Sequence, residues 1–155
     1  MPYTRLSLDG YGAKRAGSFA GKEASTTAIG YAVQVVREPG RWLDRLLVYW
    51  RSDADGYAES DCLCLNGRLH RLATRPSPSF APTDNYDVAL EDRAGEDQFQ
   101  GLAANRDTAN IERVFFYRTS TSSDWEPVSI NGHYRFKVRN AGVNMAGVAC
   151  LYVRR

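Results

Sequence analysis

The sequence has 155 residues, a length that suits one domain able to bury a core of its own. Hydrophobic residues make up 43% and charged residues 25%, which are values of globular proteins rather than of disordered or membrane-embedded chains. Because 20 basic residues are nearly balanced by 18 acidic ones, the net charge of +2 argues against a general nucleic-acid binder. Any electrostatic function therefore has to come from local clusters of charge.

Cysteine usage and hydropathy narrow the class further. Cys62, Cys64 and Cys150 do not form an even disulfide framework, and we expect Cys62 and Cys64 to be small buried residues of a strand. No cysteine or histidine pair completes a zinc pattern, so we predict no metal and no cofactor. No leading apolar segment or run of about 18 apolar residues occurs, which predicts no membrane association and folding in a reducing cytoplasm.

The first thirty residues differ from the rest because glycine, alanine, serine and threonine separate the few apolar side chains. Such a segment buries too little apolar surface to offset its conformational entropy. We predict that residues 1–30 form an extended arm that becomes ordered on another molecule, and that residues 31–155 form a single domain. The arm residues expected to bind a partner are Tyr11, Lys14, Arg15, Phe19 and Lys22.

Strand patterns begin after the arm. Residues 31–36 alternate as a strand does, whereas residues 41–50 fit both helical and strand spacing and end in a Leu-Leu-Val-Tyr-Trp run that favours a strand. Residues 61–65 and 68–72 flank Asn66-Gly67, a dipeptide typical of two-residue turns, so the sequence predicts a β-hairpin there. Prolines at 76, 78 and 82 mark a crossing that cannot join a central strand.

The second half continues in the same way. Residues 86–91 alternate, residues 92–97 form a polar turn, and residues 111–118 are apolar on both faces, which predicts a central strand. A second Asn-Gly pair at 131–132 predicts another hairpin, and residues 147–153 predict a buried closing strand. About eight strands with turns every 8–12 residues indicate an all-β fold, an antiparallel β-sandwich or jelly roll.

Residues 134–139 read Tyr-Arg-Phe-Lys-Val-Arg, so apolar and cationic side chains alternate with the period of a β-strand. Arg135, Lys137 and Arg139 therefore share one face. Like charges in that position have to be solvated, balanced by acids on a neighbouring strand, or matched to an acidic partner. An exposed or edge strand protected against aggregation is one interpretation, and a partner-binding stripe for an acidic surface is the other.

Residues with catalytic or ligand-binding potential do not converge on a recognisable site, so we predict no catalytic residues. The two histidines, His70 and His133, each flank a predicted turn and are expected to face solvent. An acidic stretch lacks the spacing of an EF-hand loop, and an ordinary turn is the favoured interpretation of Asp53, Asp55, Glu59 and Asp61. Aromatic residues at alternating positions favour core packing over a carbohydrate platform for Trp42, Trp50 and Trp125.

Several segments of the sequence resemble a known family, at residues 10–22, 84–92, 101–107, 128–132, 140–142 and 147–153. In these segments the chain resembles small structural proteins encoded in the virion gene clusters of tailed bacteriophages. The resemblance implies a non-enzymatic virion protein, assembled in the host cytoplasm, that binds and stabilises neighbouring capsid subunits as a decoration (cement) protein. Its partners would be the major capsid protein or other virion proteins, and it would be a homo-oligomer, a dimer or trimer.

Three alternatives remain open at this stage. A head–tail or tail component is the main rival within the virion class. A carbohydrate-binding β-sandwich module would use exposed tryptophans, and a hydrolase with a dispersed site would act on peptidoglycan or polysaccharide.

Overall fold

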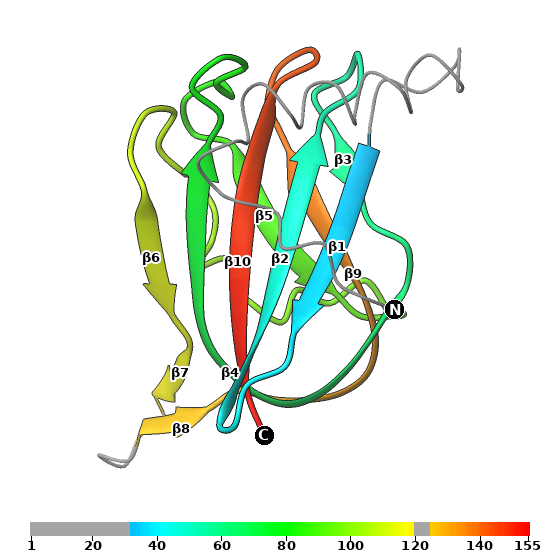
Figure 1. The fold of residues 1–155 in the computed structure, drawn as a ribbon, viewed down its shortest axis with the longest axis vertical. Helices are drawn as coiled ribbons and strands as arrows, with labels where there is room; N and C mark the ends of the chain where they lie inside the picture. Colours follow the sequence, from blue (N-terminus) through cyan, green and yellow to red (C-terminus); the bar gives the residue numbers. More distant parts are fainter. Residues whose placement is uncertain (1–31, 120–124) are drawn as a thin grey trace.

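The computed structural model of the protein describes residues 32–119 and 125–155, which contain ten strands and no helix (Figure 1). Eight strands form one curled antiparallel sheet, and the other two form a small hairpin. The strands are β1 (Ala32–Glu38), β2 (Leu43–Arg51), β3 (Ala58–Glu59), β4 (Leu63–Pro76), β5 (Asp87–Glu91), β6 (Glu112–Phe115), β7 (Tyr117–Thr119), β8 (Trp125–Pro127), β9 (Ser129–Arg139) and β10 (Ala146–Arg154). No helix long and apolar enough to cross a membrane occurs in this described part.

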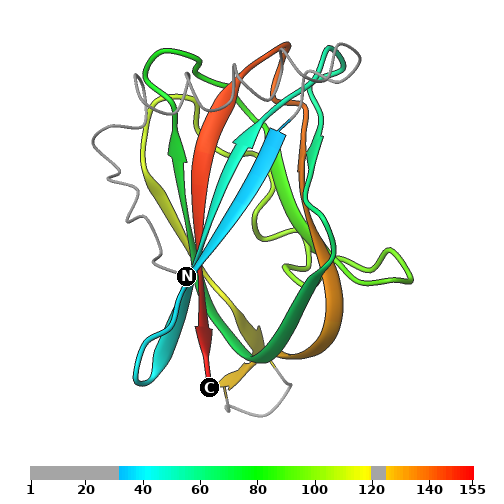
Figure 2. The same ribbon diagram turned by 45° about the vertical axis from the view of Figure 1, so that its right-hand side comes forward.

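The curl of the sheet comes from the long strand β4, which takes part in both of its halves. The first part of β4 pairs with β9, from Leu63 opposite Tyr134 to Arg68 opposite Ser129, and its later part pairs with β10 and β6. The last part of β9 pairs with β5 and β3. As a result β1, β2, β10 and β6 lie on one side of the core and β5, β9 and β3 on the other (Figures 1 and 2).

Both predicted Asn-Gly hairpins are wrong. Asn66-Gly67 lies inside β4 and Asn131-Gly132 lies inside β9, and Asn66 is the direct partner of Asn131 across the two strands. Gly67 and Gly132 have φ values of +140° and +146°, which side-chain-bearing residues rarely adopt. The two dipeptides therefore lie side by side. The positive φ values of their glycines occur where β4 and β9 bend with the curled sheet, and not at a reversal of the chain.

The predicted central strand over residues 111–118 is also wrong. It is divided into β6 and β7, and among the described strands β6 pairs with β4 alone, so it lies at an edge. Phe115 is accordingly 46% exposed, whereas Phe116 is fully buried and stacks on Phe99 with ring centroids 4.6 Å apart. Within this apolar run one phenylalanine is exposed and the next is buried in the core. A pattern of hydrophobicity alone does not distinguish these two environments.

The strands expected at 31–36, 41–50, 86–91 and 147–153 are present as β1, β2, β5 and β10. In β2 the alternate residues Leu46, Val48 and Trp50 belong to the main core and are at most 2% exposed. Trp50 packs against Tyr86 across the core with ring centroids 5.6 Å apart. Trp50 is therefore a core residue, as predicted.

Close packing between β2 and β10 leads to a first testable prediction. Gly147 is the direct partner of Trp50, and a Cβ added to Gly147 would lie 2.6 Å from Trp50 Cζ2 and 3.1 Å from the Arg75 carbonyl oxygen. We expect Gly147→Ala to lower the free energy of unfolding by about 2 kcal/mol, because an overpacked core has to shift. Urea denaturation of Gly147→Ala, Trp50→Phe and the double variant checks it: the double variant should lose less than the sum of the single losses, and strict additivity would contradict the contact.

Candidate functional site

The alternation predicted for residues 134–139 is confirmed in β9. Phe136 and Val138 are fully buried, whereas Arg135 and Arg139 are exposed and Lys137 is half-buried. The strand is flanked by β3 on one side and β5 on the other, so the edge-strand interpretation is wrong. The cationic side chains therefore form the outer surface of a strand paired on both sides.

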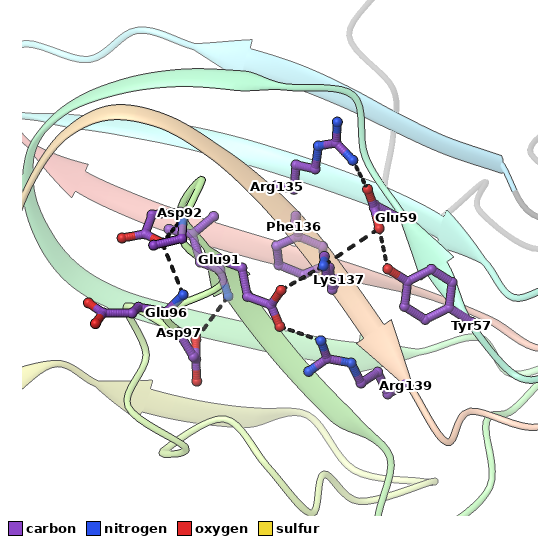
Figure 3. Close-up of polar contacts among 12 residues, drawn as sticks. Tyr57, Glu59, Glu91, Asp92, Glu96, Asp97, Arg135, Phe136, Lys137 and Arg139 are labelled. Carbon is purple, nitrogen blue, oxygen red and sulfur yellow. Dashed lines mark hydrogen bonds and ion pairs between the residues drawn. The ribbon is translucent and has the colours of Figure 1, made fainter.

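Two carboxylates from the neighbouring strands balance these cations (Figure 3). Lys137 Nζ lies 2.6 Å from Glu91 Oε2 and 3.7 Å from Glu59 Oε2. Arg135 pairs with Glu59, Arg139 pairs with Glu91, and the Tyr57 hydroxyl donates a hydrogen bond to Glu59. We call this set the charged face: Tyr57, Glu59, Glu91, Arg135, Lys137 and Arg139.

The electrostatics of the charged face keep both of its carboxylates ionised. Burial of Glu91 opposes ionisation, but hydrogen bonds from Lys137 and Arg139 outweigh it and hold the pKa of Glu91 below its ordinary value. Burial likewise opposes ionisation of Glu59, and hydrogen bonds from Tyr57 and Arg135 lower its pKa. Since a general acid needs a carboxyl group that keeps its proton near neutral pH, neither glutamate is suited to that role. The arrangement is suited to binding charge.

A cleft of about 470 Å³ adjoins the charged face. Its lining residues are Cys62, Glu91, Asp92, Arg93, Gly95, His133, Tyr134, Arg135 and Lys137. One wall is the turn at residues 92–97, which extends away from the sheet (Figure 2). We call this hollow the Arg93 cleft.

Two aspartates fix the turn that carries Arg93. Asp92 Oδ1 accepts hydrogen bonds from the amides of Ala94 and Glu96, at 2.8 and 3.0 Å. Asp97 Oδ1 accepts from the amide of Leu90 at 3.0 Å and so ties the turn back to β5. Such short side-chain-to-backbone bonds hold a turn in place without a helix or strand of its own. The position of Arg93 is therefore set by the turn.

Basic side chains at the Arg93 cleft retain free hydrogen-bonding capacity. Within the described residues the side chains of Arg93 and His133 make no hydrogen bond or ion pair, and both are exposed. Arg135 is 59% exposed, and one of its terminal nitrogens pairs with Glu59. A guanidinium has five donors, so Arg93 and Arg135 can still bind an oxyanion such as a partner's carboxylate.

The sequence prediction found part of this site. Arg135, Lys137 and Arg139 lie together as expected, and His133 is exposed as expected. His70 is half-buried, and its ring is nearly perpendicular to that of Phe115. Glu59, Glu91 and Arg93 were not predicted as members of the site. The polar turn at residues 92–97 directly after a strand was the signal for Arg93, whereas the pairing of Glu59 and Glu91 required the strand order.

The burial predicted for Cys62 and Cys64 is wrong, because both are exposed. Leu63 and Leu65 occupy the alternate, more buried positions, and Cys62 lines the Arg93 cleft. Cys150 is half-buried, and this burial raises the pKa of its thiol.

Asp53 and Asp55 belong to a turn, as predicted, whereas Glu59 belongs to β3. Asp53 Oδ1 accepts hydrogen bonds from the amides of Asp55 and Tyr57, each at 2.9 Å, and Glu59 is occupied by its ion pairs. Over residues 32–119 and 125–155 no three His, Cys, Asp or Glu side chains are grouped so that they could hold a metal ion.

The remaining aromatic and arm predictions have mixed outcomes. Trp42 is 69% exposed in the turn between β1 and β2, so core packing is wrong for this residue. Trp125 belongs to β8, but its side chain lies outside the description. The arm, residues 1–30, lies wholly outside the described residues, and with it lie Tyr11, Lys14, Arg15, Phe19 and Lys22.

Comparison with known proteins identified no relative of the chain. No protein-family model matches the chain, and no curated protein is similar to it in sequence.

Proposed function

We propose that the chain is a non-enzymatic structural protein of a tailed-bacteriophage virion, which binds and stabilises neighbouring capsid subunits as a decoration protein does. In this proposal the curled sheet is of the sandwich or jelly-roll type, and the protein acts as a dimer or trimer on the major capsid protein or another virion protein. The observation that carries it is the cationic surplus at the charged face and the Arg93 cleft. The resemblance of residues 84–92 and 147–153 to phage structural proteins supports the virion setting.

The charge count supports an acidic partner. On the charged face three cations meet two carboxylates, and at the cleft Arg93 is accompanied by Asp92, so the two surfaces together carry one positive charge in excess. Surface complementarity of this kind selects partners and orients their approach more than it adds affinity per contact. Each exposed ion pair is worth about 0–1 kcal/mol. A repeating lattice of binding sites and an oligomeric protein convert such weak contacts into firm attachment.

The test is binding to virus particles that lack the protein. We expect the double variant Arg93→Ala, Arg135→Ala to bind about tenfold more weakly than the unaltered protein, because two exposed charge contacts are lost. Its binding should also be less sensitive to NaCl between 50 and 300 mM, since fewer screened contacts remain. Co-sedimentation with particles at both salt concentrations measures this. Arg113→Ala on β6, which removes an exposed arginine of a different strand, is the matched control and should bind normally.

Two results would count against the proposal. If the Arg93, Arg135 variant sediments with particles as well as the Arg113 control does, the charged face is not the contact. The carbohydrate-binding alternative is favoured if the protein is missing from purified particles and binds a glycan that the variant Trp42→Ala no longer binds. Trp42 is suited to such a contact because it is 69% exposed. Among virion positions, quantitative mass spectrometry separates capsid lattice from neck or tail, because only a lattice position requires hundreds of copies.

A further inference from the structure

A group of arginines lies on the outward side of β4, β6 and β10, apart from the charged face. On the inward side of these strands, Leu72 and Leu151 belong to the main core and Val114 packs against it. Because side chains alternate across a strand, the residues between these positions point away from the core. We call this outward surface the arginine face: Arg68, Arg71, Arg75, Arg113 and Arg154.

Strand pairing places the arginine face in one continuous track. Arg154 lies directly opposite Arg68, and Tyr152, two residues earlier, lies directly opposite Arg71. Arg113 lies opposite Ala73, which is two residues from both Arg71 and Arg75. Directly opposed residues of antiparallel strands are about 5 Å apart, and diagonal neighbours are about 8 Å apart. Each arginine is therefore a neighbour of the next, in the order Arg75, Arg113, Arg71, Arg154 and Arg68.

Within the described residues, neighbouring acids do not balance the charge of the arginine face. None of its five arginines makes an ion pair with another described residue, and all except Arg71 are exposed. The acid that the described part of these and the adjoining strands directs to the same side is Glu38 of β1, which pairs with Arg45. Like charges on adjacent strands destabilise a sheet unless a partner compensates them. The whole-chain net charge of +2 does not show this local cluster.

The chemistry of the arginine face fits a phosphate backbone. All five cations are arginines, and the planar guanidinium group binds a phosphate through two parallel hydrogen bonds. A nucleic-acid strand carries one negative charge in every nucleotide without interruption. Neighbouring arginines about 5 to 8 Å apart match such a repeating charge more closely than they match isolated carboxylates on a protein surface.

Aromatic rings beside the track favour a single strand over a duplex. The Arg71 guanidinium lies 4.1 Å from the centre of the Tyr152 ring, and Phe115, directly opposite Arg71 on β6, is 46% exposed. Unpaired bases stack on aromatic rings and on guanidinium planes. Together β2, β10, β4 and β6 are about 14 Å across, and a sheet face of that width does not enter a major groove about 12 Å wide.

We propose that the arginine face binds single-stranded nucleic acid, with phosphates along the track from Arg75 to Arg68 and a base stacked on Phe115. The charged face lies on β9, across the core from β10 and β6, so each surface can bind its partner independently of the other (Figure 1). This inference goes beyond the proposed function and does not rest on it: it fails or holds with Arg113 and Arg154, while the proposed function fails or holds with Arg93 and Arg135.

Fluorescence anisotropy of a labelled oligothymidylate of about 15 nucleotides measures this binding with the full-length protein. We expect the variant Arg113→Ala, Arg154→Ala to bind about tenfold more weakly at 50 mM NaCl, because two phosphate contacts are lost. The slope of log K against log salt should become shallower by about 1.4, which is about 0.7 for each contact. The control Arg93→Ala, Arg135→Ala removes the same charge from another surface and should bind the oligonucleotide normally.

Two competitors define the ligand class. A DNA duplex and a polyglutamate with the same number of charges should displace the oligothymidylate only at about tenfold higher concentration. Equal displacement by either competitor, no binding of the oligothymidylate by the unaltered protein, or an equal loss in the control would each overturn the proposal. The Arg113, Arg154 variant should still sediment with virus particles, so a failure here is distinct from a failure of the proposed function.

A second measurement does not depend on the stability of a variant. An oligonucleotide that carries 5-iodouracil in place of thymine cross-links to adjacent aromatic side chains when it is irradiated. Mass spectrometry of the digested complex should place the links on peptides that contain Phe115 or Tyr152. Links at these residues support the proposal. Links at neither residue, or links confined to peptides that contain residues 93 or 133–139, would overturn it.

Discussion

Replacement of Gly67 by alanine is expected to lower the free energy of unfolding by about 3 kcal/mol or more, and the same change at Gly132 by about 1 kcal/mol. The two glycines are a matched pair. Each follows an asparagine, each has a positive φ, and they lie on adjacent strands next to paired asparagines. The difference between them is the space around the added methyl group.

At Gly67 that space is occupied. A Cβ there would lie 2.4 Å from the Arg154 carbonyl oxygen and 2.9 Å from Val153 Cγ1, so β10 has to move. At Gly132 the nearest atom is the Tyr134 hydroxyl oxygen at 3.9 Å, which is ordinary contact. Both alanines bear the strain of φ near +140°, but Gly67→Ala adds a collision with backbone.

Urea denaturation of the two variants checks this expectation. Equal losses of stability would mean that the close approach of β4 and β10 at Gly67 is not real. Equal losses are also what the hairpin prediction implies, because both glycines would then occupy equivalent turn positions with no third strand nearby. The experiment therefore discriminates between the two descriptions of the Asn-Gly pairs.

The Asn-Gly error shows what local sequence determines here. The alternation of residues 134–139 follows from period two and needs no knowledge of neighbours, and it was predicted correctly. Asn-Gly indicates a place where φ becomes positive, which is also correct for Gly67 and Gly132. Whether the chain then reverses or continues depends on the partners of β4 and β9, which are over 60 residues apart in the sequence.

The candidate site likewise contains residues that could be predicted from one strand alone and residues that could be predicted only from the strand order. The three cations of β9 could be predicted from one strand. Balance by acids on a neighbouring strand was one of the possibilities, but the acids themselves could not be identified, because Glu59 and Glu91 come from β3 and β5, whose places beside β9 are set by the sheet topology. The exposure of Cys62 likewise depends on which face of β4 meets the core. Both faces there are small or apolar, so the pattern is ambiguous.

Lys137 is the central cation of the charged face, and its replacement is expected to weaken the fold. Its side chain is 19% exposed and lies between Glu91, which is 9% exposed, and Glu59, which is 21% exposed. Without Lys137 each glutamate keeps a single arginine partner, Arg135 for Glu59 and Arg139 for Glu91, so the charge of the two carboxylates is less well compensated. We expect Lys137→Met to lower the free energy of unfolding at pH 7 by about 2 kcal/mol, less than for a fully buried pair because water still reaches the group.

The pH dependence of this loss has a definite sign. The pKa values of Glu59 and Glu91 in the folded protein are lowered, so their ionised forms stabilise the fold above the unfolded pKa of about 4.3. That contribution disappears as the pH falls through the lower folded values. The stability gap between the unaltered protein and Lys137→Met should therefore be widest near pH 7 and shrink progressively below about pH 4.

The matched control for Lys137→Met is Arg93→Met, which removes a cation from the same side of the sheet. Because the Arg93 side chain has no partner in the described part of the chain, its loss should change the free energy of unfolding by less than about 0.5 kcal/mol at any pH. Urea denaturation of the three proteins between pH 3 and pH 7 measures both effects. A gap for Lys137→Met that stays constant over this range would show that its methylene packing, and not its charge, stabilises β9.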